Sequence, residues 1–190
     1  MKGKYPCISE NTHFTFSNNF NGSLKKLPKV IYLKLGDNFN RSVNKLPKIL
    51  LYLELGLKFD KTIDKIPDSL LELKLGHDLC YFNHSVENLP PNLTDISFSS
   101  LFNYSVDNLP QKLTTIKFNR CFNCTVDNLP TSIKTIIFGQ SFNQSLNNLP
   151  CKIITIDLGS VLEYNKNLNL LSNSVENLIL SKTTSIDSPV

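Results

Sequence analysis

A nine-residue phrase recurs along this chain at nearly constant spacing, and this repetition constrains the fold more than any other feature of the sequence. The phrase reads Phe-Asn-x-Ser/Thr-Leu/Val-x-x-Leu-Pro, with its clearest copies at residues 102–110 and 122–130. The distance from each Phe to its Pro is always eight residues, so the length variation falls between a Pro and the next Phe. Such a period predicts a solenoid of stacked repeats. Seven copies begin at Phe20, Phe39, Phe59, Phe82, Phe102, Phe122 and Phe142.

Each phrase is followed by an apolar-x-x-apolar-x-apolar segment, as at Ile133, Ile136 and Phe138. The alternation at its end is typical of a short strand with one buried face. A proline in every repeat would interrupt a helix, and no ten-residue helical pattern occurs. We therefore predict a mostly β solenoid with one curved parallel sheet of about nine short strands, the first at 14–16 and the last at 178–180, and little or no helix.

An eighth copy is hidden by substitution near the end of the chain. Tyr164-Asn165 takes the place of Phe-Asn, Leu168 that of Leu/Val, and Leu171 that of the leucine before proline. The predicted organisation is therefore an N-terminal cap at 1–13, a solenoid of about eight repeats at 14–180, and a flexible tail at 181–190.

The asparagine that follows each phenylalanine has an expected structural role. Its side chain can satisfy backbone groups of the adjacent turn, and stacked copies can form a ladder of amide hydrogen bonds. Asp60 replaces it in one repeat and keeps only the acceptor half of that role. A row of surface asparagines that binds a ligand is the alternative.

Charge and composition exclude several classes of protein. The net charge is +4, with 13 Lys/Arg against 8 Asp/Glu in residues 1–80 and 7 against 8 in residues 81–190. Only two of the basic residues are arginines, which argues against a nucleic-acid binder and favours a solvated basic face. No apolar run is long enough for a membrane span, and no signal peptide is evident. Five cysteines, an odd number without paired spacing, fit a reducing compartment better than a disulfide framework. We expect a cytoplasmic, non-secreted monomer.

The sequence offers no catalytic or cofactor-binding motif. It has three histidines and no Gly-rich phosphate loop, so we expect no enzyme and no cofactor. His77, Cys80 and His84 lie at the longest inter-repeat segment and are metal-ligand types, but they lack a second cysteine pair, which favours a bulged surface loop without metal. Cys121-x-x-Cys124 is best explained as substitution within a repeat, because the redox motif normally opens a helix.

Strand positions that point away from the core should form two columns on the concave face of the sheet. Tyr32 and Tyr52 should lie side by side, next to a row of Lys34, Glu54 and Lys74 whose charges can pair. Tyrosine is enriched at binding hot spots, so these columns form the candidate contact patch, and a solvated sheet face is the alternative. The candidate protein-binding residues are Tyr32, Lys34, Tyr52, Glu54, Glu72, Lys74 and Lys117.

The strand segment on a 20-residue period resembles leucine-rich repeats, so the resemblance implies a leucine-rich-repeat-like α/β solenoid. The Phe-Asn to Leu-Pro phrase resembles the FNIP repeat, a relative found mainly in social amoebae and in giant DNA viruses of amoebae. The resemblance covers about residues 14–180 and implies a non-catalytic protein–protein interaction module. Some members carry an N-terminal F-box, for which the 13 residues before the first strand are too few. Two alternatives remain open, a substrate-recognition component of a ubiquitin ligase assembly without its own F-box, and a structural or virion-associated protein.

Overall fold

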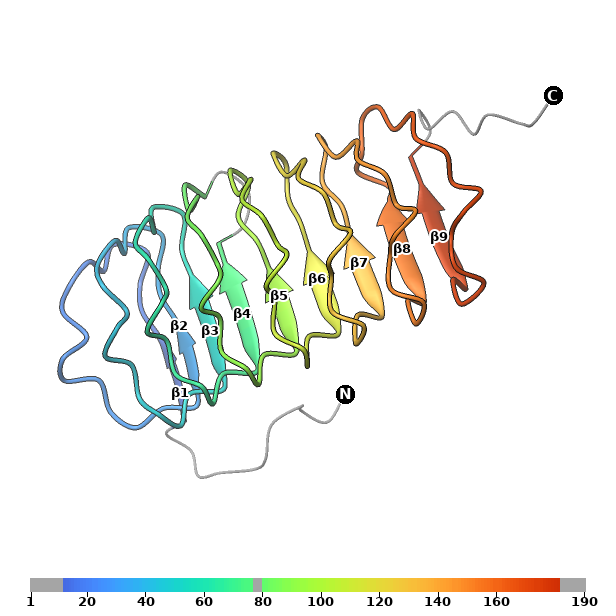
Figure 1. Ribbon diagram of the computed structural model, residues 1–190. Coiled ribbons are helices and arrows are strands. Elements are labelled where there is room, and N and C mark those ends of the chain that lie inside the picture. The colour runs from blue at the N-terminus through green and yellow to red at the C-terminus, as the bar shows by residue number, and fades with distance from the viewer. Residues whose placement is uncertain (1–11, 77–79, 182–190) are drawn as a thin grey trace.

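The computed structural model describes residues 12–76 and 80–181, which wind into successive coils that each contribute one strand. The strands form one parallel sheet along one side of the molecule, and the return segments lie on the other side (Figure 1). Strand order follows chain order, and within the described residues the structure contains no helix. The strands are β1 (His13–Thr15), β2 (Tyr32–Lys34), β3 (Tyr52–Leu55), β4 (Glu72–Leu75), β5 (Asp95–Ser97), β6 (Thr115–Lys117), β7 (Thr135–Ile137), β8 (Thr155–Leu158) and β9 (Asn177–Leu180).

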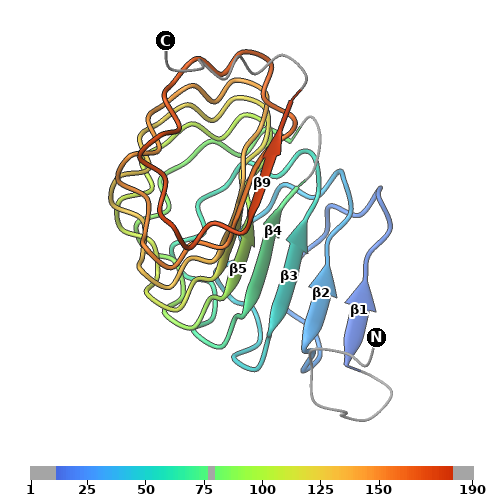
Figure 2. The ribbon, with the colours of Figure 1, turned by 90° about the vertical axis from the view of Figure 1, so that its right-hand side faces the viewer.

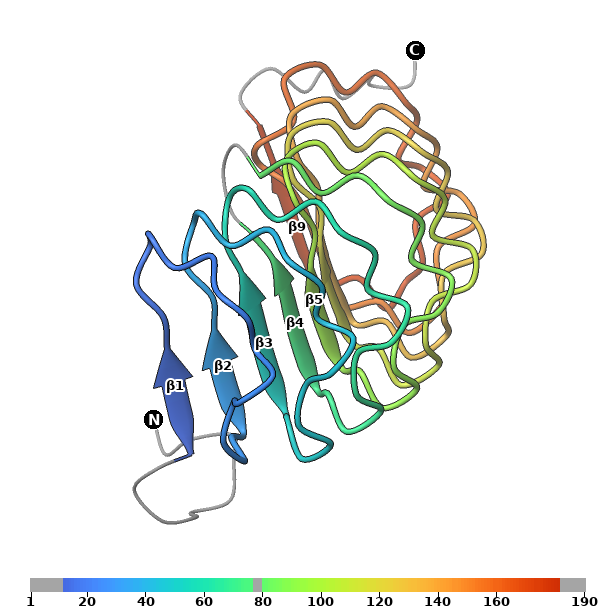
Figure 3. The same ribbon diagram turned by 90° about the vertical axis from the view of Figure 1, so that its left-hand side faces the viewer.

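The predicted mostly β solenoid with nine parallel strands is confirmed. The first strand begins one residue earlier than predicted, so His13 belongs to the sheet rather than to the region predicted as the cap. Residues 1–11 and 182–190, which make up most of the predicted cap and tail, lie outside the described residues. Viewed from either end, the coils are rotated relative to one another, which gives the sheet a twist along the solenoid (Figures 2 and 3).

Identical repeat positions align across neighbouring strands. Leu33 pairs with Leu53, and Leu53 with Leu73, so each inward-facing column is continuous along the sheet. These leucines are completely buried, because every coil places its apolar strand residues on the same side. A single hydrophobic core therefore runs the length of the solenoid between the sheet and the return segments.

The phenylalanines of the phrase form the most regular column of this core. Phe102, Phe122 and Phe142 are fully buried, with ring centroids 6.1 and 6.2 Å apart and nearly parallel planes. A second aromatic column follows the ends of the strands and packs against the first. The ring centroid of Phe118, directly after β6, lies 3.7 Å from that of Phe122. Tyr164 continues the first column at 6.2 Å from Phe142, which confirms the hidden eighth copy.

Tight turns explain the x-x spacing between the apolar residues of the return path. The N–H of Leu50 donates to the carbonyl of Pro47 at 3.1 Å, and that of Leu113 donates to Pro110 at the same distance. A four-residue turn of this kind directs its first and last side chains to one side, here the core. The serine of the phrase closes another turn, as Ser42 Oγ accepts from the N–H of Asn44 at 3.2 Å.

The predicted asparagine ladder is present, and its geometry is specific. Asn103 Oδ1 accepts from the backbone N–H of Asn123 at 2.9 Å, and Asn123 Oδ1 accepts from that of Asn143 at 2.8 Å. The ladder thus joins the side chain of one coil to the backbone of the next, on the exposed side of the turn. It changes at the long inter-repeat segment, where Asp60 Oδ1 instead contacts His84 Nε2 at 2.6 Å.

Close packing of coils explains why some turns require glycine. A Cβ built on Gly139 would lie 1.9 Å from the carbonyl oxygen of Asn119 in the preceding coil. Gly76 has a φ of 77°, a conformation that favours glycine, at the entrance to the long inter-repeat segment.

Candidate interaction surface

Two columns of outward-pointing strand residues cover the side of the sheet that faces away from the core, which we call the outer sheet face. The register places Tyr32 opposite Tyr52, and Lys34 opposite Glu54, as predicted. Glu54 in turn lies opposite Lys74 on the next strand. Six of the seven predicted residues therefore gather on β2, β3 and β4. Lys117 lies apart from them on β6, with β5 between.

Aromatic stacking orders the first column. The Tyr32 and Tyr52 rings lie 4.1 Å apart with an angle of 6° between their planes, and His13 continues the stack at 5.1 Å from Tyr32. Lys74 Nζ lies 5.2 Å from the centroid of the Tyr52 ring, within reach of a cation–π interaction. The stack therefore fixes the orientation of both tyrosines.

Tyr52 is far less accessible than the sequence predicted for a contact residue. Its side chain is 4% exposed, whereas Tyr32 is half-buried. Burial, together with a hydrogen bond from Tyr52 Oη to Glu54 Oε2 at 2.5 Å, raises the pKa of the Tyr52 phenol well above its ordinary value. Tyr52 is therefore a buried residue that positions Tyr32 and Glu54 through its contacts, and Tyr32 has the more accessible aromatic ring.

Glu54 is the centre of the charged part of this surface. Lys34 Nζ lies 2.7 Å from Glu54 Oε1, which confirms the predicted pairing of these two residues. Burial disfavours the charged carboxylate, but the hydrogen bonds from Lys34 and Tyr52 outweigh it and lower the pKa of Glu54. The same bond to Glu54 raises the pKa of Lys34. Both groups are held in their charged forms.

The second lysine of the row pairs differently from the prediction. Lys74 Nζ makes its ion pair with Glu72 Oε1, two residues back on the same strand, at 3.6 Å. The positive charge of Lys74 still stabilises the Glu54 carboxylate, and it is a minor cause of the lowered pKa of Glu54. The side chains of Lys34 and Lys74 remain about two-fifths exposed, so their positive charge is accessible above the ordered Tyr52 and Glu54 side chains.

Lys117 lies beside a hollow that the sequence did not reveal. This pocket of about 490 Å³ is at the carboxyl ends of β6 and β7, and Arg120, Ile137 and Gln140 are among its lining residues. The position of Arg120 holds several different residue types in the other repeats, so no pattern in the sequence indicates it. The pocket forms because stacking places Ile137, Gly139 and Gln140 of the next coil beside Lys117 and Arg120.

The long inter-repeat segment does not bring its described metal-type side chains together. Cys80 is buried, its Sγ donates to the carbonyl of Gly56, and burial raises the pKa of its thiol. His84 contacts Asp60 and lies with its ring edge toward Phe82. His77 lies outside the described residues. Among residues 12–76 and 80–181, no three His, Cys, Asp or Glu side chains cluster as a metal site would require.

Cys124 of the Cys-x-x-Cys pair also has the environment of a structural thiol. Cys124 Sγ donates to backbone and side-chain oxygens of Asn103, and burial raises the pKa of its thiol. A reactive thiol requires the opposite shift, toward the thiolate. Cys121 and Cys124 are both free cysteines.

The fold and this surface together define a solenoid of the leucine-rich-repeat type. The family model described as FNIP Repeat matches residues 82–121 and 122–160, so these residues contain FNIP repeats, as the phrase predicted. A similar solved structure is that of CroV588, a giant-virus protein described as a novel circular LRR protein, with 29% sequence identity and a TM-score of 0.65. The match covers 82% of this chain and 28% of that chain. Comparison with curated proteins gives no match.

The part of the chain that the structure describes contains no helix long and apolar enough to cross a membrane.

Proposed function

We propose that this chain is a non-catalytic protein-interaction module whose partner binds the outer sheet face over β2, β3 and β4. The observation that supports it is the preordered cluster formed by the Tyr32–Tyr52 stack and the Lys34–Glu54 ion pair. A surface whose side chains are already fixed loses less conformational entropy when it binds. Tyr32 supplies an accessible aromatic ring beside the ammonium groups of Lys34 and Lys74.

The chemistry of this surface favours a protein segment with acceptor groups as the ligand. Tyr32 can pack against an apolar side chain, and the exposed lysines can pair with carboxylates at the rim. A repeat solenoid suits this role, because stacked coils present a continuous and rigid surface. The cytoplasmic location and the monomeric state remain predictions from the sequence.

Affinity purification of the tagged chain from its native or infected cells, followed by quantitative mass spectrometry, tests the proposal. Changing Tyr32→Ala together with Lys74→Ala should reduce recovery of a specific protein by about tenfold or more, the loss of about 1.4 kcal/mol or more of binding energy. The matched control is Thr135→Ala together with Lys134→Ala, at and beside β7, which should leave recovery unchanged. Equal recovery with both double variants would reject this surface.

The identity of the recovered protein separates the functional alternatives. Recovery of ubiquitin ligase scaffold proteins that depends on Tyr32 would support a substrate-recognition component. Recovery of capsid proteins would support a virion-associated role.

A further inference from the structure

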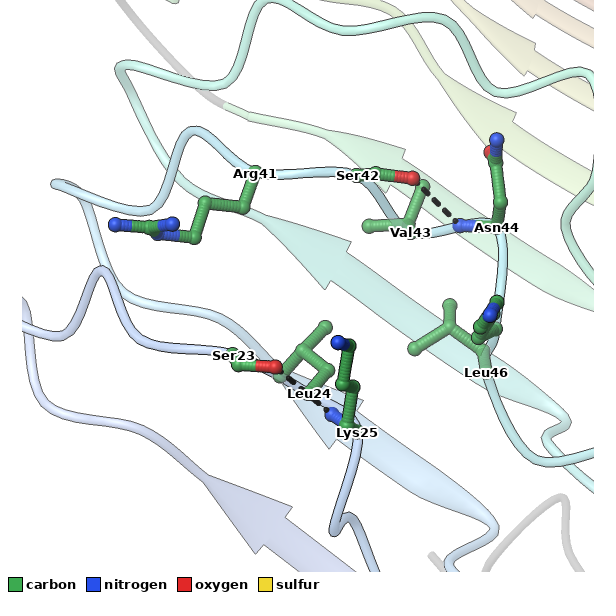
Figure 4. A pocket seen from close by; sticks show the side chains of 9 residues that line it. Ser23, Leu24, Lys25, Arg41, Ser42, Val43, Asn44 and Leu46 are labelled. Atoms are coloured by element: carbon green, nitrogen blue, oxygen red, sulfur yellow. Dashed lines mark hydrogen bonds between the residues drawn. The ribbon is translucent and has the colours of Figure 1, made fainter.

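A groove separates the phrase segments of the first two coils, away from the outer sheet face. It consists of two adjoining pockets, one of about 380 Å³ (Figure 4) and one of about 350 Å³. Leu24, Lys25, Lys45 and Leu46 line both pockets, which are therefore continuous. We call it the basic groove, lined by Leu24, Lys25, Lys29, Lys45, Leu46 and Lys48.

The basic groove has an apolar floor between cationic walls. Leu24 and Leu46 are 9% and 8% exposed, so only a small part of each reaches the groove. Ile49, at the rim of the second pocket, is 47% exposed. The four groove lysines are all exposed. The groove therefore offers apolar contact at its base and positive charge around it.

The positive charge of this region is not neutralised within the described part of the chain. In residues 12–76 and 80–181, no carboxylate lies at ion-pair distance from any lysine of the basic groove. Arg41, which lines the first pocket, uses its Nε to donate to the backbone carbonyl of Asn21 and keeps its charge. Residues 21–50 contain a single acidic residue, Asp37, against Lys25, Lys26, Lys29, Lys34, Arg41, Lys45 and Lys48.

The same repeat positions in later coils are occupied differently. Asn128 Nδ2 donates to Asp107 Oδ1 at 3.1 Å, and Asn148 Nδ2 donates to Asp127 Oδ1 at 3.2 Å. The polar side chains at these positions therefore form hydrogen bonds between neighbouring coils. The first two coils instead place lysine after lysine at equivalent positions, Lys26 with Lys45 and Lys29 with Lys48. Like charges at adjacent positions repel, and an external anion would relieve that repulsion.

We infer that the basic groove binds an acidic segment of another protein that carries a leucine-sized apolar side chain. The carboxylates pair with the groove lysines, and the apolar side chain packs on Leu24 and Leu46 beside Ile49. This combination favours a peptide over single-stranded nucleic acid, because none of the residues that line the groove is aromatic and could stack with a base. The basic groove is separate from the outer sheet face, so the two proposals can succeed or fail independently.

Fluorescence anisotropy with a labelled peptide of repeated Glu-Glu-Leu units tests this inference on the full chain. The peptide should bind with an affinity that falls as salt is raised. Lys25→Gln together with Lys45→Gln should weaken binding by about tenfold. Lys152→Gln together with Lys166→Gln removes the same charge from distant coils and should leave the affinity within about twofold.

Three results would overturn the inference. The first is an unchanged affinity for the Lys25→Gln and Lys45→Gln variant, or an equal loss in the distant control. The second is equal binding of a peptide of repeated Glu-Glu-Ser units, which would show that the apolar floor has no role. The third is tighter binding of a thymidine oligonucleotide of the same length, which would assign the groove to nucleic acid. Circular dichroism of both variants should match that of the unmodified chain, because all four lysines are exposed.

Discussion

Truncation of Phe122 to alanine should strongly destabilise the solenoid, because this ring is part of the central aromatic column. Phe122 is fully buried and stacks with Phe102 at 6.1 Å, with Phe142 at 6.2 Å and with Phe118 at 3.7 Å. Replacing a buried phenylalanine by alanine costs about 3–5 kcal/mol, and the upper part of this range applies where neighbours cannot collapse into the cavity. The backbone bonds between coils hold these neighbours in place. A domain with a total stability of about 5–15 kcal/mol would lose about a fifth or more of it.

Urea unfolding followed by circular dichroism measures this loss as the change in the free energy of unfolding. The matched control is Phe14→Ala in β1, where the ring is 38% exposed at the end of the sheet. Its expected loss is smaller, about 1–2 kcal/mol, because the ring is already 38% exposed and less apolar area leaves the core. A loss below about 1 kcal/mol for Phe122→Ala, or equal losses for the two variants, would refute the view that the phrase exists to pack the core.

Three further predictions concern single contacts. Gly139→Ala should destabilise by at least about 1 kcal/mol in urea unfolding, because its Cβ would lie 1.9 Å from the Asn119 carbonyl oxygen. Asn123→Ala should cost about 0.5–1.5 kcal/mol by removing the acceptor for the Asn143 N–H, while Asn123→Asp should retain most of the stability. Glu54 has a lowered pKa in the folded state, so its contribution is complete above its ordinary pKa and is lost as the pH falls through its folded pKa. Glu54→Gln should therefore show a smaller loss of stability in acid, measured by thermal unfolding across a pH series.

Each of these has a distinct contradicting result. Wild-type stability of Gly139→Ala would mean that the two coils can separate at no cost. An equal loss for Asn123→Asp and Asn123→Ala would show that the acceptor oxygen is not what matters. A Glu54→Gln variant with the same acid sensitivity as the unmodified chain would place the responsible carboxylates elsewhere.

The sequence was sufficient to predict the scaffold because its constraints are periodic. Phe122 recurs at a fixed distance from Pro130, and Ile136 falls in register with Ile116 and Ile156. A residue that recurs at every coil must meet its own copies when the coils stack, so columns and ladders follow directly from spacing. The strand order, the outward columns and the hidden copy at Tyr164 were predictable on this ground.

The details of the surface were less predictable because they depend on side-chain conformations. Tyr52 was expected to be accessible, but stacking on Tyr32 and bonding to Glu54 bury it. Lys74 was expected to pair with Glu54 and instead reaches Glu72, since a long flexible side chain has several partners within range. The half-buried Tyr32 ring and the partly exposed side chains of Lys34 and Lys74 are accessible to a partner.

The groove in the basic half of the chain was also not predictable from the sequence. The excess of lysine in this half was interpreted as a solvated face, because charge counts alone do not show a groove. The groove arises where Leu24 and Leu46 from neighbouring coils lie below Lys25 and Lys45, a juxtaposition that requires the stacked structure. The cap, the tail and the role of His77 remain sequence predictions.

Site-specific photo-crosslinking in cells tests the central claim, that the outer sheet face over β2 to β4 binds a protein. A benzoylphenylalanine placed at Tyr32 should give a discrete cross-linked protein adduct on irradiation, because its ring occupies the accessible end of the aromatic stack. The same group at Thr135 on β7 should give none. An adduct from Thr135 alone, or no adduct from Tyr32 in cells where the chain is captured with a partner, would contradict the account.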